Sequence, residues 1–138
     1  MNDFSGLIFF PHFPFFQNQN QVIFSYKEEA KQLTKGYRIL TVYSSNLGKL
    51  KELPEWVGDL TNLKSLDSSF LELSEIPEWI GNIVNLRGLK LMGNEIEEIP
   101  ESIKNLNNLE ELWLQRNNIS KIPEWLGELE KLDMLMLS

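Results

Sequence analysis

Apolar residues along the chain recur in a block pattern that returns every 23 residues. Pro54, Pro77, Pro100 and Pro123 have the same spacing, and the segments around them read LPEWVGDLTNLKSL, IPEWIGNIVNLRGL, IPESIKNLNNLEEL and IPEWLGELEKLDML. A fixed period of this length is typical of a solenoid, in which each repeat buries its apolar face only against neighbouring repeats. The pattern therefore predicts a stacked array, and such arrays usually present extended binding surfaces.

The spacing of the apolar residues changes within each repeat. Leu89 and Leu91 lie two residues apart, which is the alternation of a short strand with one side toward a core. After each proline, apolar residues such as Ile80, Ile83 and Leu86 return every third residue, which predicts a helical or 3₁₀ segment. Each repeat should therefore contain one short strand and one short helical segment.

The period divides the chain into frames of equal length. The frames are 40–62, 63–85, 86–108 and 109–131, followed by a stub at 132–138. The first two frames are degenerate; in the second, Ser68 stands where a leucine is expected and Leu71 where an asparagine is expected. In this alignment Ser44 of the first frame falls in line with Asp67 of the second.

Two frames carry a complete signature. Residues 86–100 and 109–123 both follow the pattern LxxLxLxxNxLxxIP, which is the signature of a leucine-rich repeat. Its asparagine, here Asn94 and Asn117, can bond to backbone groups that are left unpaired where the chain turns. The spacing of the leucines and the asparagine, which recurs from repeat to repeat, is what makes the motif specific for a fold.

The 23-residue unit resembles the intracellular Ras-group type of leucine-rich repeat protein, over about 100 of the 138 residues. The plant extracellular type usually has a glycine before the Ile-Pro pair and a longer period, whereas this chain has Glu75, Glu98 and Lys121 there. The resemblance implies an α/β solenoid: a curved array of short parallel strands with 3₁₀ or short helices on the convex side. It also implies a scaffold or regulator near small GTPases.

Residues 1–24 stand outside the repeat and are expected to be irregular. They contain seven of the eight phenylalanines and the single histidine, without the basic start of a signal peptide, and their apolar run is too short to span a bilayer. An aromatic cap over the open end, a disordered or mis-assigned start and a membrane-touching anchor are the three open readings. Residues 25–36 have capping-box spacing and predict an N-terminal capping helix, followed by the repeat array at 37–138, about four repeats and the stub.

Composition narrows the class of partner. The chain has 138 residues and no cysteine, which fits one small domain and favours a reducing, cytoplasmic location. Residues 51–138 contain eight basic and seventeen acidic residues, a net charge of −9. Such a surface repels phosphate backbones, so nucleic acid is not the expected partner.

The sequence shows no catalytic constellation. With one histidine and no cysteine, Ser–His, Cys–His and multi-histidine zinc sites are not expected. Glu55, Glu78, Glu101 and Glu124 recur with the repeat, as expected of a solvated outer face rather than of a metal or acid–base site. We therefore expect no enzyme activity, no metal and no cofactor. Residues 118–120 form an N-glycosylation sequon, which matters only in a secreted chain.

The tryptophans fall into two groups. Trp56, Trp79 and Trp125 each lie two residues after a repeat proline, and we expect them to stack between turns on the outer arc rather than to contact a partner. Trp113 lies between two strand leucines, so alternation turns it onto the concave face, where it binds a partner or only shields its own strand. The predicted partner-binding residues on this face are Trp113, Met92, Lys90, Glu111, Asp67, Gln115, Met134 and Met136.

These features predict a non-catalytic protein–protein interaction module, with signalling as the candidate process and an unknown protein as its partner. The alternative is a recognition segment of a larger receptor or enzyme whose catalytic part lies outside this chain. Leu132, Leu135 and Leu137 belong to a last turn without a polar capping segment, and such an edge tends to pair. Self-association through this C-terminal end, or a truncated gene, is therefore expected.

Overall fold

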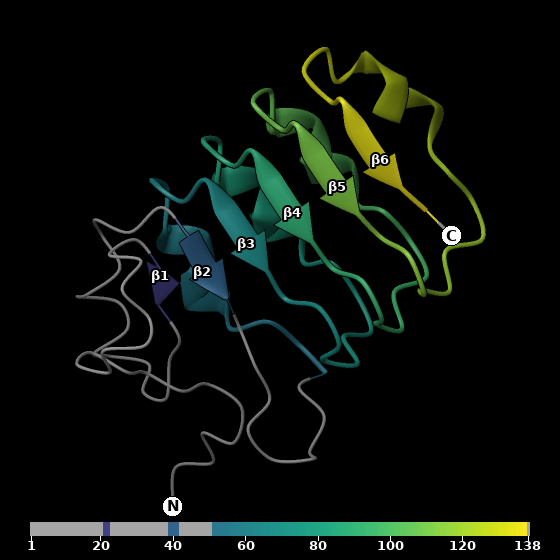
Figure 1. Cartoon of the computed structure of the whole chain (residues 1–138), viewed down its shortest axis with the longest axis horizontal. Coiled ribbons are helices and arrows are strands. Elements are labelled where there is room, and N and C mark those ends of the chain that lie inside the picture. The colour runs from purple at the N-terminus through teal and green to yellow at the C-terminus, as the bar shows by residue number, and fades with distance from the viewer. Residues whose placement is uncertain (1–20, 23–38, 42–50, 138) are drawn as a thin grey trace, which may run out of the picture.

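The described part of the chain is a single parallel sheet of very short strands. A computed structural model describes residues 21–22, 39–41 and 51–137, with side chains for 51–137. The strands in these residues are β1 (Gln21–Val22), β2 (Ile39–Thr41), β3 (Ser65–Asp67), β4 (Gly88–Lys90), β5 (Glu111–Trp113) and β6 (Met134–Met136). They pair in parallel in chain order, so each turn of the chain lies beside the next one (Figure 1).

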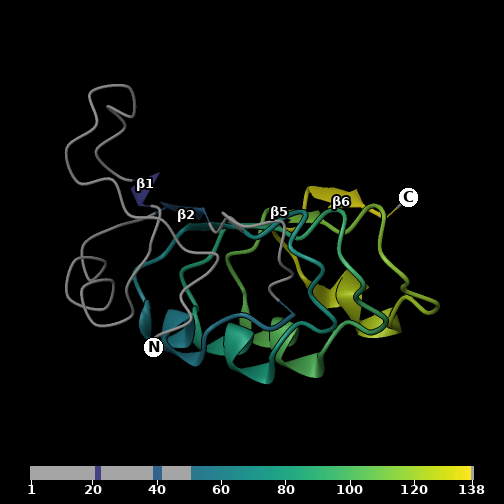
Figure 2. The same ribbon diagram turned by 90° about the horizontal axis from the view of Figure 1, so that it is seen from below.

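The 3₁₀ helices form a second layer. They are η2 (Glu55–Asp59), η3 (Glu78–Asn82), η4 (Glu101–Asn105) and η5 (Glu124–Glu128). Each begins directly after a repeat proline. Proline suits the start of a helix because a backbone N–H at that position would have no acceptor within the helix, so nothing is lost by its absence. The strands lie along one side of the array and the 3₁₀ helices along the other (Figure 2). The predicted α/β solenoid with one strand and one 3₁₀ segment per repeat is thereby confirmed.

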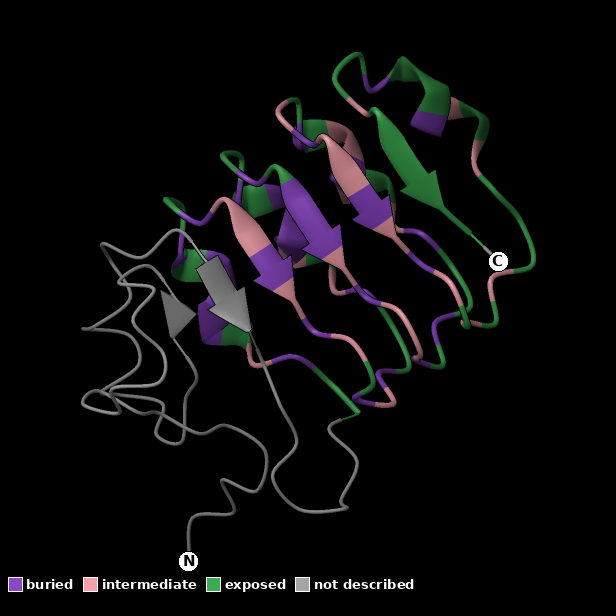
Figure 3. Ribbon diagram, in the orientation of Figure 1, coloured by how far each residue is buried: buried purple, intermediate pink, exposed green. Residues whose placement is uncertain are grey.

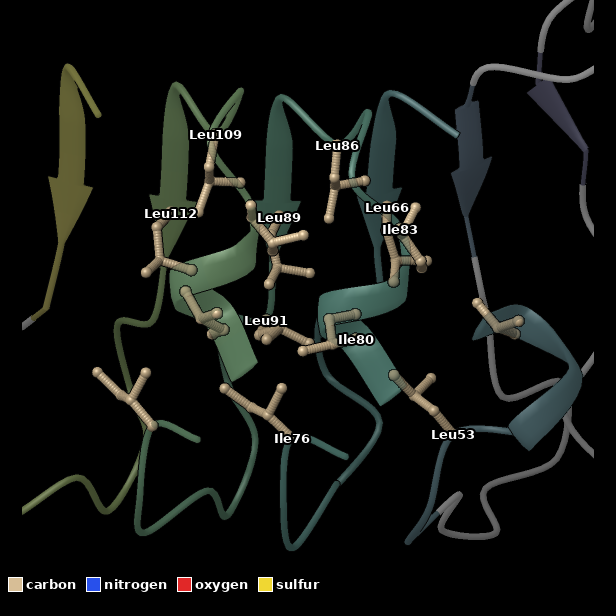
Figure 4. Close-up of a cluster of buried hydrophobic side chains, with 14 of the residues drawn as sticks. Leu53, Leu66, Ile76, Ile80, Ile83, Leu86, Leu89, Leu91, Leu109 and Leu112 are labelled. Carbon is tan, nitrogen blue, oxygen red and sulfur yellow. The ribbon is translucent and has the colours of Figure 1, made fainter. Parts of the chain in front are cut away.

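The core lies between these two layers. Leu66, Leu89 and Leu112 occupy the middle of β3, β4 and β5, pair in register, and are fully buried. They point toward the 3₁₀ layer, where Ile80 lies on the facing side (Figure 4). Ile80 and Ile103 of that layer are also fully buried. Burying each such side chain stabilises the fold by about 1.5–3 kcal/mol, and every one of them depends on a neighbouring turn to cover it.

Asn94 supplies a second set of contacts between turns. Its Oδ1 accepts hydrogen bonds from the backbone N–H groups of Leu71 and Leu73, both at 3.0 Å. Its Nδ2 donates to the carbonyl of Ser68 at 3.0 Å and to that of Leu91 at 2.9 Å. One buried side chain therefore satisfies four backbone groups, three of them in the preceding turn.

Asn117 repeats this arrangement one turn later. Its Oδ1 accepts from the Ile96 N–H at 3.1 Å, and its Nδ2 donates to the carbonyls of Leu91 and Leu114, both at 2.9 Å. The predicted role of the two asparagines in bonding the turning backbone is confirmed. A further pair that the sequence reasoning did not assign, Asn85 and Asn108, donates to carbonyls of the preceding turn on the opposite corner.

The tryptophans of the 3₁₀ layer pack between turns, as expected. Trp56 is buried, and Trp79 and Trp125 lie against the core. The Trp79 ring covers Gly58 of the preceding turn so closely that a Cβ there would lie 3.1 Å from it. Two turns further along, Lys104 stands at the position of Gly58, and its ammonium lies 5.6 Å from the Trp125 ring centroid.

The same Lys104 forms an ion pair with the first residue of η4. Its Nζ donates to Glu101 Oε1 at 2.8 Å, and this hydrogen bond holds the pKa of Glu101 below its usual value. The pair is exposed to solvent, so it adds little to stability. Glu101 and the other repeat-start glutamates are exposed, in keeping with a solvated outer face.

The first turn differs from the prediction. Leu40 pairs with Leu66, 26 residues further along, and Thr41 rather than Ser44 pairs with Asp67. The predicted frame at 40–62 was wrong because the first turn is three residues longer than the 23-residue period. This segment lacks the leucine and asparagine of the motif, so the sequence did not show the extra length. Gln21–Val22, within the segment expected to be irregular, forms β1 beside β2. The predicted capping helix at 25–36 lies outside the described residues.

Replacing Asn94 by alanine should destabilise the fold by about 2–4 kcal/mol, because it leaves buried N–H groups of Leu71 and Leu73 without an acceptor. Asn85→Ala is the matched control: it removes a single exposed hydrogen bond and should cost about 0.5 kcal/mol or less. Urea unfolding followed by circular dichroism measures both. Equal losses for the two variants would contradict the role assigned to Asn94.

Candidate functional site

The solvent side of the sheet, called the strand face below, is built from the strand residues that alternate with the core leucines. Strand register arranges these residues in two rows that run across the turns. The first row is Ser65, Gly88, Glu111 and Met134, and the second row is Asp67, Lys90, Trp113 and Met136. Six of the eight residues predicted from the sequence thus lie on one surface: Asp67, Lys90, Glu111, Trp113, Met134 and Met136.

Trp113 is the central aromatic residue of the strand face. It lies between the buried Leu112 and Leu114 and is itself only half-buried, so its ring points away from the core. The Lys90 ammonium lies 4.5 Å from the ring centroid, a distance at which the cation attracts the π face. On its other side Lys90 pairs in register with Asp67. Charge and aromatic surface are therefore adjacent along one row.

Two polar atoms, one on Trp113 and one on Gln115, are buried but have no hydrogen-bond partner among the described residues. They are the Nε1–H of Trp113, a donor, and the Oε1 of Gln115, an acceptor. Buried polar atoms are nearly always paired, because leaving one unpaired costs about 1–3 kcal/mol. A bound group that offers both an acceptor and a donor, such as a peptide bond, has the chemistry to satisfy both atoms.

The remaining predicted residues extend the surface past the carboxyl ends of the strands. Met92 and Gln115 follow directly after the buried Leu91 and Leu114 and are half-buried. The Gly93 N–H donates to the Gln115 carbonyl at 2.9 Å, so these segments stay side by side beyond the strands. Met134 and Met136, in the last turn, are exposed. Strands β3 to β5 are coloured partly buried and partly intermediate, whereas β6 is coloured exposed (Figure 3).

Phe70 is a surface residue that the sequence reasoning missed. Its side chain is 58% exposed, and its backbone has a φ of 59°, in the left-handed region that bulky residues seldom adopt. Gly93 and Arg116 occupy the same place in the next turns with φ of 69° and 55°. The Phe70 ring lies on Gly93, where any Cβ would collide with it. Phe70 precedes Gly93 by one 23-residue period, and this spacing was the sign in the sequence that residue 70 takes a backbone conformation typical of glycine.

The described residues of the strand face hold no cluster of metal-ligating side chains. In the residues that the structure describes, no group of three or more His, Cys, Asp or Glu side chains is placed to hold a metal ion. No helix there is both long and apolar enough to cross a membrane. A pocket of about 730 Å³ lies elsewhere, lined mainly by carboxylates and by Trp125. The chemistry of the strand face is that of a contact surface: apolar side chains, a cation and a few hydrogen-bonding groups.

The comparisons with known proteins agree with this architecture. Residues 85–138 match the family model described as leucine rich repeat, and the described residues have the leucine-rich repeat fold. A search of curated protein sequences gave no significant match.

Several solved structures share the fold. A leucine-rich repeat protein of Leptospira interrogans is 28% identical over 82% of this chain, with a TM-score of 0.57. The ectodomain of the plant membrane receptor kinase GASSHO1/SCHENGEN3 from Arabidopsis thaliana, solved in complex with CASPARIAN STRIP INTEGRITY FACTOR 2, is 30% identical over 82%, with a TM-score of 0.64. The functional domain of InlJ from Listeria monocytogenes is 23% identical over 79%, with a TM-score of 0.62.

The chain spans only part of each of these proteins. It covers 34% of the Leptospira protein, 14% of the plant ectodomain and 22% of the Listeria domain. The similarity therefore concerns a short array of turns, and these arrays belong to bacterial proteins and to a plant ectodomain alike.

Replacing Phe70 by asparagine should raise the free energy of unfolding by up to about 1 kcal/mol, because asparagine tolerates the left-handed backbone that phenylalanine resists. Phe70→Ala is the control, since it also removes the ring but leaves a side chain that disfavours this backbone. Thermal unfolding compares the three proteins. If the asparagine and alanine variants are equally stable, the backbone at residue 70 is not strained.

Proposed function

We propose that the chain is a non-catalytic protein–protein interaction module that binds a partner protein on the strand face. The observation that carries this proposal is the position of Trp113, half-buried on the strand face with a buried Nε1–H that lacks a partner. Tryptophan is enriched among the few residues that dominate the binding energy of protein interfaces. Its contribution is largest where the side chain is desolvated in the centre of the interface. Lys90, Met92 and Met136 surround it with a cation and adaptable apolar side chains.

The size of the surface limits the partner. Neighbouring strands are about 4.8 Å apart, so β3 to β6 span only about 15 Å across the turns. A partner that contacts this width buries at most about 800 Å² of the chain, the value for an ordinary interface or less. The interaction we propose is therefore of modest area and concentrated around Trp113.

We further propose that the array is of the intracellular Ras-group type and acts as a scaffold in signalling. The support is the 23-residue period and the charged residues Glu75, Glu98 and Lys121 before the Ile-Pro pairs. A recognition segment of a larger receptor or enzyme is the second candidate. It is favoured by the small share, 14%, of the plant receptor ectodomain that the chain spans.

Trp113→Ala should weaken partner binding by about 2 kcal/mol or more, about 30-fold in Kd, with a loss of stability below about 1 kcal/mol. Trp79→Ala is the matched control from the 3₁₀ layer. It removes packing against the core and Gly58, so it should lower stability by about 2–4 kcal/mol and leave binding intact in the folded fraction. Thermal unfolding and quantitative pull-down measure the two properties separately. Unchanged binding by folded Trp113→Ala would place the partner site elsewhere.

The partner itself can be identified by a photo-crosslinking side chain placed at Met136, next to Trp113 in register. The control carries the same side chain at Val84, which is exposed in the segment after η3. A protein that is crosslinked from Met136 and lost on Trp113→Ala is the expected result. Equal crosslinking from both positions would count against the strand face.

A cytoplasmic location is part of the same proposal, and Asn118 offers its test. Asn118 and Ser120 are exposed, so the sequon is accessible to glycosylation in a secreted chain. The chain isolated from its natural cells should have the same mobility before and after glycosidase treatment. A shift that disappears in Asn118→Gln would show passage through the secretory pathway and overturn the cytoplasmic assignment.

A further inference from the structure

Two aromatic residues flank the segment at the end of β4 from opposite sides. Phe70 belongs to the turn of β3, and its N–H donates to the Met92 carbonyl at 2.8 Å. Trp113 belongs to β5, and its carbonyl accepts a hydrogen bond from the Leu91 N–H, also at 2.8 Å. Leu91 and Met92 are consecutive residues, so backbone hydrogen bonds hold both aromatic residues beside the same short segment.

Three apolar side chains therefore lie on neighbouring turns: those of Phe70, Met92 and Trp113, called the aromatic strip below. The Phe70 ring is 58% exposed and lies on Gly93, the residue that follows the half-buried Met92. Trp113 is half-buried on the other side. The turns of β3, β4 and β5 each have a paired strand on both sides, so the strip lies within the array.

The fold does not require a phenylalanine at residue 70. Its φ of 59° lies in the left-handed region, and the same position one turn later is occupied by Gly93, which adopts this conformation without strain. With more than half of its surface in solvent, the Phe70 side chain gains little burial to offset the strain. A strained and exposed aromatic residue points to a contact outside the chain.

We propose that the aromatic strip binds an amphipathic α-helix of the partner, with basic residues beside its apolar side. This inference rests on the proposed function, because Trp113 is one of the two aromatic anchors. The backbones of β3, β4 and β5 are already paired with neighbouring strands, so this part of the strand face offers side chains and no free strand edge. An occupant must therefore satisfy its own backbone N–H and C=O groups, which an α-helix does internally.

The spacing of the two aromatic residues suits one side of a helix. Phe70 follows β3 and Trp113 lies in β5, so they are two strand spacings apart, about 10 Å across the turns. Residues seven apart on an α-helix lie on the same side and about 10.5 Å apart along the axis. At the Trp113 end, an asparagine or glutamine side chain of the helix offers an acceptor for the unpaired Trp113 Nε1–H and a donor for Gln115 Oε1.

The charges around the aromatic strip favour a basic helix. Asp67 and Glu111 lie beside it on the strand face, and Glu95 is exposed at its edge. Lys90 and the exposed Arg116 are the nearby basic residues. The whole chain has a net charge of −7, so lysine or arginine residues beside the apolar side of the helix are attracted to it.

Peptide display on the 138-residue chain tests the inference. The probe is a library of peptides of about 16 residues in a helical frame rich in alanine and lysine, randomised at positions i, i+3, i+4 and i+7. The matched library has the same randomised positions and prolines in its frame, which prevent a helix. We expect binders from the helical library only, with apolar residues at the randomised positions. Equal enrichment of the two libraries, enrichment of the proline library alone or no binder at all would overturn the inference.

Variants of the chain decide whether Phe70 takes part in binding. Phe70→Asn should weaken the selected helical peptides at least about tenfold in Kd. Because this substitution is also expected to stabilise the fold, unfolding cannot be the cause of the loss. Phe70→Tyr is the matched control: it keeps an aromatic ring and should change Kd by less than about threefold. Equal affinity of the original chain and Phe70→Asn would overturn the inference.

The same peptides separate this inference from the proposed function. Peptides that lose affinity on Trp113→Ala but not on Phe70→Asn would overturn the aromatic strip and leave the strand face as the binding surface. Peptides affected by neither variant would contradict both proposals. Replacing the lysines of a selected peptide by glutamate should weaken binding at least about tenfold at about 0.1 M salt. Unchanged affinity would overturn the basic character assigned to the helix.

Discussion

The contact between consecutive turns has two components on which the rest of the structure depends. Leucines in register, such as Leu66, Leu89 and Leu112, remove one another from water, and the buried Asn94 and Asn117 bond the backbone where it turns. A single turn of 23 residues has neither component by itself, because its strand holds three residues and its helical segment five. Stability is therefore a property of neighbouring pairs of turns, as in other solenoids.

This constraint separates the positions that hold the fold from those that are free to bind. In the inner turns the leucine and isoleucine positions face the core, and Asn94 is held by four hydrogen bonds to the backbone. The strand positions that alternate with the leucines neither fill the core nor bond the turning backbone, so their residues differ from turn to turn. One row of such positions holds Asp67, Lys90, Trp113 and Met136. A tryptophan in that row is informative because packing of the core does not require it.

The sequence predicted the repeating part well because that part is local. The leucine alternation and the prolines set the strands and the 3₁₀ segments, and the asparagines set the turn bonds. The alignment of the first turn was wrong because the repeat can be traced only through turns that contain the leucines and the asparagine of the motif. Leu40 pairs with Leu66, three residues beyond the partner that the 23-residue period predicted. Phe70 was missed for another reason: a phenylalanine by itself does not indicate a left-handed backbone, and only its 23-residue spacing from Gly93 pointed to one.

Departures from the repeat are informative about where stability is low. Ser68 occupies a leucine position and is fully buried, and its hydroxyl has no partner within the described residues, so this turn lacks apolar contact and carries an unsatisfied group. Leu135 in β6 is only partly covered. Trp113 lies between these two positions, in β5, next to the fully buried Leu112.

The position of the strand face relative to the open edge links binding to stability. Anything that binds across Trp113 and Met136 contacts β5 and β6 together, and a ligand that binds the folded state stabilises what it touches. Because each turn depends on its neighbour, stabilisation of the last turn also restricts opening of the turn before it. A contact on the strand face that reaches β6 should therefore also stabilise the turn that contains Trp113.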